Sequence, residues 1–187
     1  MRSFIAFEVK TQSKLSNFIA NLKATLSNDK VKWVRLPVLH QTLFFLGEVT
    51  EEQFESVKNS LSQYLHDIPS FEIRIKGLGI FGNSRNPKVI WVGIEESEPL
   101  NKLHRRVCNA VMPLGFVPDK RGFNPHITIG RVKFVANLES LRSIIYENKS
   151  RFFQKSLVNN VTIYKSDLTP QGPLYTPLFS QKLKPPI

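Results

Sequence analysis

Residues 40–43 read His-Gln-Thr-Leu and residues 126–129 read His-Ile-Thr-Ile, so a histidine, any residue, a threonine and an aliphatic residue follow one another twice. Threonine fills only 8 of the 187 positions. Chance would place two such pairs among four histidines in about 1% of chains of this composition. The repeat therefore indicates an internal duplication, in which each copy supplies one element of the same kind.

Each copy lies in a run of apolar and β-branched residues, so the sequence predicts strands over residues 39–46 and 126–132. Side chains two residues apart in a strand share one face and lie about 6 to 7 Å apart along the backbone. His40 with Thr42, and His126 with Thr128, therefore each present an imidazole beside a hydroxyl.

Strands and helices alternate through the rest of the chain, without a linker or a low-complexity tract. Apolar spacing and turn residues predict further strands over 2–9, 33–34, 71–78, 89–94 and 158–164, an edge strand around 176–182, helices over 11–28, 50–69, 99–112 and 138–147, and a loop over 79–88. This order favours an α+β fold in which residues 1–187 form a single domain built from two interleaved halves. A doubly wound nucleotide-binding sheet is the competing architecture, but no Gly-rich phosphate loop follows any predicted strand.

The chain is basic, with 26 Lys and Arg against 15 Asp and Glu and a net charge of +11. Residues 102–133 alone carry seven basic residues against Asp119. Such an excess attracts polyanions, of which nucleic acid is the commonest, although solvated surface charges would give the same composition.

No run of residues is long and apolar enough for a membrane span, no secretory leader opens the chain, and Cys108 has no partner for a disulfide. We expect a cytoplasmic protein without membrane contact.

Two imidazoles in matching positions suit acid and base catalysis on one substrate, because histidine titrates near pH 6.5. Cleavage of a phosphodiester needs one group to deprotonate the attacking oxygen and another to protonate the leaving oxygen. Thr42 and Thr128 could donate to the non-bridging oxygens. A metal site is not expected, because neither motif adds a carboxylate, a cysteine or a third histidine at ligand spacing. His66 and His104 are interpreted as ordinary helix residues, and Cys108 as a buried thiol.

The segments 40–47 (HQTLFFLG) and 125–131 (PHITIGR) resemble the two signature motifs of the two-histidine phosphoesterases. They are most similar to the RNA 2′,3′-cyclic phosphodiesterases, which are also called bacterial and archaeal 2′-5′ RNA ligases. The similarity extends to residues 2–8, 33–35, 77–81, 91–93 and 166–175. A resemblance spread over most of the chain is more specific than one motif alone.

The resemblance implies a bilobal fold of two pseudo-symmetric halves, each with a mainly antiparallel sheet and outer helices, that enclose a cleft. His40 and Thr42 would come from one half, and His126 and Thr128 from the other. The implied activity is hydrolysis of 2′,3′-cyclic phosphate ends of RNA, such as tRNA fragments, or of cyclic nucleotides, to 2′-phosphates. No metal and no cofactor is implied, and we expect a monomer. Some relatives also join tRNA halves reversibly through a 2′-5′ bond.

Arg131 occupies a position that the resemblance assigns to phosphate binding, and Phe45 is its equivalent in the first motif. Strict alternation would place Arg131 on the face opposite His126, so the assignment requires a bulge or the end of the strand. Aromatic residues near the motifs could stack on a base or belong to the core; the candidates are Trp33, Phe44, Phe123 and Tyr175.

Two other functions stay open from the sequence. The first is a related enzyme that acts on another cyclic or 2′-5′-linked phosphodiester, including ligation in reverse. The second is a basic RNA-binding module whose paired motif is catalytically idle. Product analysis separates the first from the main hypothesis, and salt-dependent RNA binding that survives loss of both histidines would identify the second.

Overall fold

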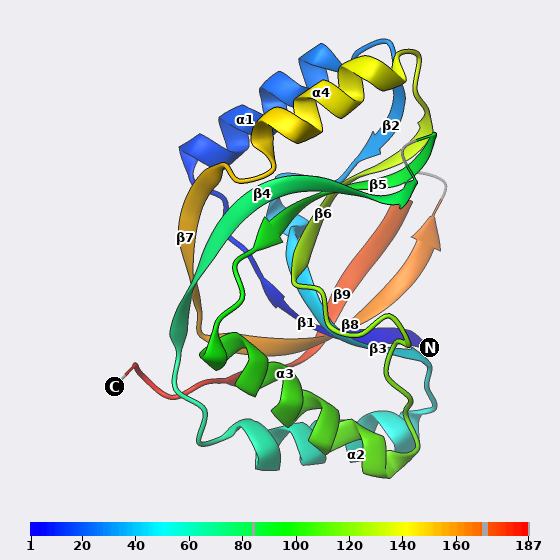
Figure 1. The fold of residues 1–187 in the computed structure, drawn as a ribbon. Helices are drawn as coiled ribbons and strands as arrows, with labels where there is room; N and C mark the ends of the chain where they lie inside the picture. Colours follow the sequence, from blue (N-terminus) through cyan, green and yellow to red (C-terminus); the bar gives the residue numbers. More distant parts are fainter. Residues whose placement is uncertain (84, 170–171, 187) are drawn as a thin grey trace.

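The computed structural model describes residues 1–83, 85–169 and 172–186, and places their strands in two antiparallel sheets (Figure 1). The first sheet contains, in spatial order, β3 (His40–Glu48), β1 (Arg2–Glu8), β8 (Asn160–Thr169) and β9 (Gly172–Lys182). The second contains β2 (Lys30–Trp33), β6 (His126–Phe134), β5 (Asn86–Ile94), β4 (Phe71–Asn83) and β7 (Phe152–Val158). The predicted α+β fold with two mainly antiparallel halves is confirmed.

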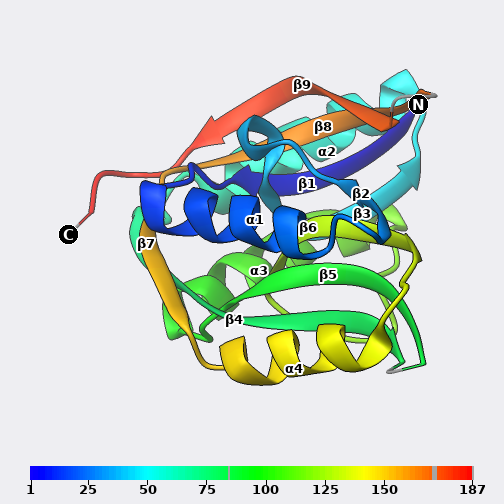
Figure 2. The same ribbon diagram turned by 90° about the horizontal axis from the view of Figure 1, so that it is seen from above.

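Two pairs of helices cover the sheets on their outer sides (Figures 1 and 2). Helices α1 (Ser13–Thr25) and α4 (Leu138–Asn148) lie against β7 and β4 of the second sheet, whereas α2 (Glu51–Leu65) and α3 (Glu98–Val111) lie against β9 and β3 of the first. Apolar residues at helical spacing form the buried side of α1, α2 and α3, whereas α4 buries Leu141 and partly buries Ile144 and Ile145. A capping box begins α2, since Thr50 Oγ1 accepts from Gln53 N while Gln53 Oε1 accepts from Thr50 N.

The chain crosses between the sheets several times. β1 and β3 belong to the first sheet, but β2, which lies between them in sequence, is an edge strand of the second. After the second sheet is complete, β8 and β9 return to the first. One continuous cluster of buried apolar side chains extends through both sheets, so each half packs against residues that the other half contributes.

The loop predicted over residues 79–88 is wrong, because most of this segment extends β4 and β5 into a long hairpin. Turn-forming residues predicted the loop, namely Gly82, Asn83, Asn86 and Pro87. Gly79 marked its start, since glycine usually interrupts a strand. Here Gly79 lies opposite Trp91, and a Cβ atom at residue 79 would overlap the Trp91 ring. The glycine therefore makes room for the indole ring within the strand pair.

The carboxyl-terminal third contains more strand than the sequence predicts. β7 was not predicted, β8 runs to Thr169, and β9 begins at Gly172. β9 is an edge strand, as predicted. Prolines are tolerated there because an edge strand does not need every N–H group for pairing. Residues 170–171, which connect β8 to β9 in sequence, lie outside the described residues.

Candidate active site

The two motif strands have the same local structure. β3 and β6 each begin at the histidine, span nine residues and show the same sequence of buried, half-buried and exposed positions. His40 and Thr42 are half-buried and share one face, and His126 and Thr128 do the same in β6. The expected presentation of an imidazole beside a hydroxyl therefore occurs in both halves.

A β-bulge follows the threonine in each strand. Against β1, the pairing passes from Thr42 to Phe44, so that Leu43 has no opposite residue. Against β5, it passes from Thr128 to Gly130, so that Ile129 has none. An extra residue reverses the alternation of the side chains that follow it.

The bulges bring the next outward-pointing residues to the histidine face. Arg131 lines the same cavity as His126, and Phe45 occupies the equivalent position in β3 with 62% of its surface exposed. The geometric requirement for Arg131 to reach a phosphate is thus met by a bulge. The same irregularity in both halves also supports the internal duplication.

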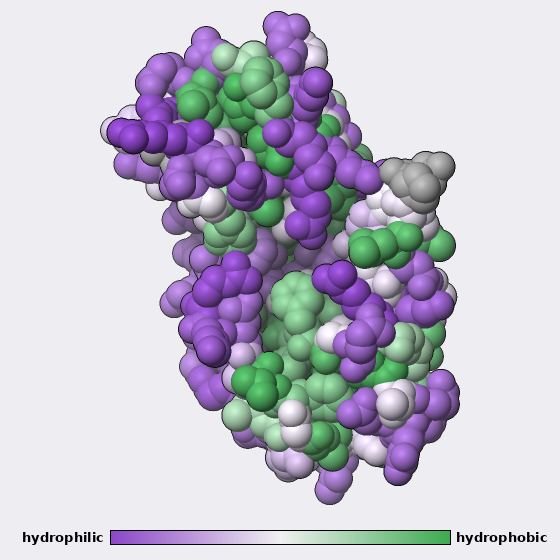
Figure 3. Space-filling model, turned by 90° about the vertical axis from the view of Figure 1, so that its right-hand side faces the viewer, coloured by the Kyte–Doolittle hydropathy of each residue, from purple (hydrophilic) through white to green (hydrophobic). Residues whose placement is uncertain are grey.

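All five predicted site residues line one cavity of about 570 Å³. They are His40, Thr42, His126, Thr128 and Arg131. The cavity opens on the face shown in Figure 3, where the surface is hollowed between the upper and lower parts of the molecule. Two motifs from distant parts of the sequence therefore meet in one place.

Backbone carbonyl groups fix the orientation of both imidazole rings. His40 Nδ1 lies 2.8 Å from Val38 O, and His126 Nδ1 lies 2.7 Å from Asn124 O. A carbonyl oxygen only accepts hydrogen bonds, so each Nδ1 carries the proton and donates it. In its neutral form each ring therefore has its free lone pair on Nε2, where it can take up or deliver a proton.

Burial lowers the pKa of His40 and of His126 below the ordinary value of 6.5. The positive charge of Arg131 lowers the pKa of both rings further, and the charge of His126 lowers the pKa of His40. The hydrogen bonds to the two carbonyls act in the opposite direction, because they stabilise the charged rings. Both histidines are therefore mainly neutral at pH 7 until an anion enters the cavity.

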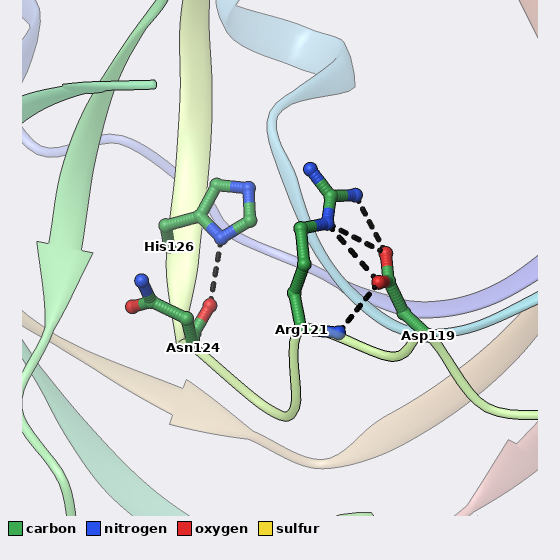
Figure 4. Close-up of polar contacts among 4 residues, drawn as sticks. All are labelled: Asp119, Arg121, Asn124 and His126. Carbon is green, nitrogen blue, oxygen red and sulfur yellow. Dashed lines mark hydrogen bonds and ion pairs between the residues drawn. The ribbon is translucent and has the colours of Figure 1, made fainter. Parts of the chain in front are cut away.

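Arg121 adds a second positive charge beside His126. Its guanidinium lies between Asp119 and the His126 ring (Figure 4). Asp119 Oδ2 accepts from Arg121 Nη2 at 2.6 Å, and hydrogen bonding by Arg121 lowers the pKa of Asp119 to about 2. Arg121 also lowers the pKa of His126 through its charge. The pair is exposed, so solvent weakens both effects.

Gln41 is a functional candidate that the sequence analysis missed. Its side chain is 1% exposed, and its Oε1 accepts from the backbone N–H of His126 at 2.5 Å. Its Nε2 donates to Thr42 O. The equivalent position in β6 is the apolar Ile127, so a polar residue at an inward-facing strand position was the available signal. Gln41 connects the two motifs directly.

Aromatic rings support both imidazoles. The His40 ring lies 5.1 Å from the rings of Phe4 and Tyr175, and the His126 ring lies 4.6 Å from that of Phe81. Of the four aromatic candidates from the sequence, Tyr175 lines the cavity. Phe44 is buried in the core, and Phe123 stacks on His104 at 3.9 Å. Trp33 packs against the core as a partly buried residue.

The remaining histidines and the cysteine lie outside the cavity lining. His66 follows α2, and its Nδ1 donates to Gln63 O. His104 Nε2 lies 3.4 Å from Cys108 Sγ on α3, and burial raises the pKa of that half-buried thiol. The positions of His66 and His104 agree with their interpretation as ordinary helix residues, whereas Cys108 is half-buried and not buried as the sequence predicts. In the part of the chain that the structure describes, no three His, Cys, Asp or Glu side chains form a group that could hold a metal ion.

Two antiparallel sheets that each bring a His-x-Thr strand to one cavity define the class of the two-histidine phosphoesterases. A sequence model described as the 2′-5′ RNA ligase superfamily matches residues 11–170, and the chain belongs to this enzyme superfamily. Within it, the chain is similar to the RNA 2′,3′-cyclic phosphodiesterase of Methanothermobacter thermautotrophicus, with 34% identity over 94% of this chain and 95% of the relative. A protein of the same name from Thermotoga maritima is 34% identical over 96% and 94% of the two chains.

A solved structure gives the same result for the fold. The crystal structure of the protein TT0787 of Thermus thermophilus superposes with a TM-score of 0.79 at 25% identity, and the superposition covers 99% of each chain.

Across residues 1–83, 85–169 and 172–186, no helix combines the length and apolar character that a membrane crossing requires.

Proposed function

We propose that the protein hydrolyses 2′,3′-cyclic phosphate ends of RNA to 2′-phosphates, with His40 and His126 as the acid and the base. The observation that carries this proposal is the matched pair of imidazoles, each held through Nδ1 by a backbone carbonyl, in one cavity. The names of the two relatives support the choice of substrate.

The reaction needs two proton transfers. One neutral imidazole takes a proton from water at Nε2, and the water oxygen attacks phosphorus. The bond between phosphorus and O3′ breaks, and the other imidazole, charged at the start, gives its Nε2 proton to that oxygen. The products are a 2′-phosphate and a free 3′-hydroxyl, and the two histidines have exchanged protonation states.

The remaining predicted residues stabilise the phosphate. The hydroxyl groups of Thr42 and Thr128 donate hydrogen bonds to the non-bridging oxygens, on which negative charge increases during attack. Arg131 contributes a permanent positive charge on the same face as His126. The anionic phosphate also raises the pKa of both histidines, and so makes the charged acid form accessible near neutral pH.

Ligation is the second candidate, because the matching superfamily carries that name. A 5′-hydroxyl could occupy the place of the attacking water and open the same ring. The phosphorus–O3′ bond would break and a 2′-5′ phosphodiester would form, with no nucleotide cofactor because one ester bond replaces another. Incubation of two RNA fragments with wild-type protein, followed by analysis of linkage type, distinguishes ligation from hydrolysis.

The test of hydrolysis is an RNA oligonucleotide with a 2′,3′-cyclic phosphate end, incubated with protein in EDTA. We expect a 2′-phosphate product at an unchanged rate in EDTA, and a loss of kcat of roughly 10²- to 10⁴-fold in His40→Ala and in His126→Ala. His66→Ala serves as the control. Inhibition by EDTA would contradict metal independence, and RNA binding without turnover would favour the idle RNA-binding module.

The proposal also includes a monomer in the cytoplasm that acts on RNA ends such as tRNA fragments. The unpaired Cys108 fits a reducing compartment. Size-exclusion chromatography with light scattering measures the mass in solution. A mass of twice the chain's 21.5 kDa would contradict the monomer.

A further inference from the structure

The charge of the cavity exceeds what one cyclic phosphate needs. Apart from the histidines, the described residues that line it include Arg2, Lys32, Arg131 and Lys133, and no Asp or Glu is among them. A cyclic phosphate carries a single negative charge. Arg131 and a charged histidine already exceed that charge, so the lysines are left without a counter-charge from the terminal phosphate.

Three of these cations form a cluster at the edge of the second sheet. Lys32 of β2 lies directly opposite Arg131 of β6, and Lys133 follows Arg131 by two residues on the same face. Like charges directly opposite each other destabilise a strand pair. None of the ion pairs found between described residues involves any of the three. The fold therefore keeps an unfavourable cluster that an anionic ligand would relieve.

The side chain of Lys32 lies against the first sheet rather than extending into solvent. It is half-buried, and its side chain passes close to Gly172 at the start of β9, in the other sheet. A Cβ atom at residue 172 would lie 2.8 Å from Lys32 Cε and 3.1 Å from Nζ. The ammonium group therefore crosses from the edge of the second sheet to the first sheet, which places it at the border of the cavity.

The cluster breaks the symmetry of the two motifs. In β3 the positions equivalent to Arg131 and Lys133 are Phe45 and Gly47, which also line the cavity. The His and Thr positions are the same in both halves, but only the β6 side continues with cations. Among the described lining residues, Arg2 of β1 is the only Lys or Arg from the first sheet, so the cavity is more basic along β2 and β6. This more basic side gives an RNA strand a direction in which to leave.

We propose that Lys32 and Lys133 form a second phosphate subsite, which binds the phosphodiester on the 5′ side of the terminal nucleotide. Arg131 and Lys133 lie about 6 to 7 Å apart along the strand, a spacing on the scale of one nucleotide of extended RNA. The subsite makes an oligonucleotide a better ligand than a mononucleotide. This inference rests on the proposed function, since the catalytic cavity defines where the terminal phosphate lies.

Product binding tests the subsite without turnover. Calorimetry would compare adenosine 2′-phosphate with a triadenylate that ends in a 2′-phosphate. We expect the triadenylate to bind about tenfold more tightly or better, because charge-assisted contacts to a second phosphate are strong. Its log Kd should also depend more steeply on log salt, by about 0.7 for each additional phosphate neutralised on a single strand. Replacement of its last internucleotide phosphate by a neutral methylphosphonate should remove the advantage in wild-type protein.

Protein variants give the matched comparison. The quantity compared is the Kd of adenosine 2′-phosphate divided by the Kd of the triadenylate. In Lys32→Ala and in Lys133→Ala this ratio should fall toward one. Lys30→Ala, which removes the same charge from the same strand outside the cavity lining, should keep the wild-type ratio. Equal affinity of wild-type protein for both ligands, or a preference that survives the methylphosphonate, would overturn the subsite. Failure of hydrolysis would contradict the proposed function alone, because these ligands are not turned over.

Discussion

Gln41 controls the position of a residue 85 places away in the chain, since its buried amide accepts from His126 N. Gln41→Met keeps the length of the side chain and leaves that N–H without its partner. We expect a loss of roughly 1 to 3 kcal/mol in the free energy of unfolding. We also expect kcat to fall roughly ten- to a hundredfold with little change in KM, because a small displacement of a catalytic group is costly. Urea unfolding and steady-state kinetics measure the two effects.

Gln154 provides the control for this substitution. It is a second buried amide, and it accepts from Gln12 N and donates to Lys10 O, outside the cavity lining. Gln154→Met should reduce stability similarly but leave kcat unchanged. If both variants lost activity in proportion to stability, Gln41 would have no positioning role.

The lowered pKa values of the two histidines predict the pH dependence of kcat/KM. A neutral base and a charged acid coexist mainly between the two pKa values, so the profile is a bell with its maximum there. Because both pKa values lie below 6.5 in the free enzyme, the maximum of kcat/KM should lie below about pH 6.5. The kcat profile should peak at higher pH, because the bound anionic phosphate stabilises both charged rings.

Arg131→Gln tests the electrostatic part of this explanation. Removal of the guanidinium charge raises the pKa of both histidines, so the kcat/KM maximum should move to higher pH while the rate falls. A maximum that stayed in place would show that Arg131 does not act on the histidines through its charge.

At the scale of elements, the hairpin of β4 and β5 supports His126 through Trp91, whose ring centre lies 6.3 Å from the imidazole. Gly79→Ala inserts a methyl group where the indole lies. We expect stability to fall by about 1 to 3 kcal/mol, as overpacking does elsewhere, and kcat/KM to fall with it. Thermal unfolding and kinetics check this, with Lys76→Ala at an exposed position of β4 as the control. Unchanged stability in Gly79→Ala would mean that the ring has free space.

The strands also show what sequence patterns could predict. Alternation was enough to place His40 with Thr42 and His126 with Thr128, because these pairs precede the bulges. It failed beyond Leu43 and Ile129, because a bulge depends on the pairing with a neighbouring strand, which local sequence does not encode. For the same reason Gly79 was interpreted as part of a loop.

At the scale of the whole molecule, the interleaved sheets and the continuous core predict cooperative unfolding of residues 1–187 as one domain. Trp33 and Trp91 both lie in the second sheet, so their fluorescence reports on that half, whereas far-ultraviolet circular dichroism reports on both. The two urea transitions should coincide. Separate midpoints would show that the halves unfold independently and would contradict the single domain.

Composition and motif resemblance were enough to predict the class of fold. They also selected five candidate residues that the structure brings to one cavity, and the roles of these residues stay a prediction. They could not predict contacts that only the folded chain creates, such as the bond from Gln41 to His126 or the cluster of Lys32 with Arg131 and Lys133. These contacts join segments about 85 to 100 residues apart. Neither of the two segments in a contact has a local sequence pattern that indicates its partner.

The central claim is that both histidines act on one phosphate. A crystal structure with a bound nucleoside 2′-phosphate tests it most directly. We expect one phosphate within hydrogen-bond distance of Nε2 of both His40 and His126, with the hydroxyl groups of Thr42 and Thr128 on its oxygens. A phosphate that contacts only one imidazole, or that binds outside this cavity, would contradict the claim.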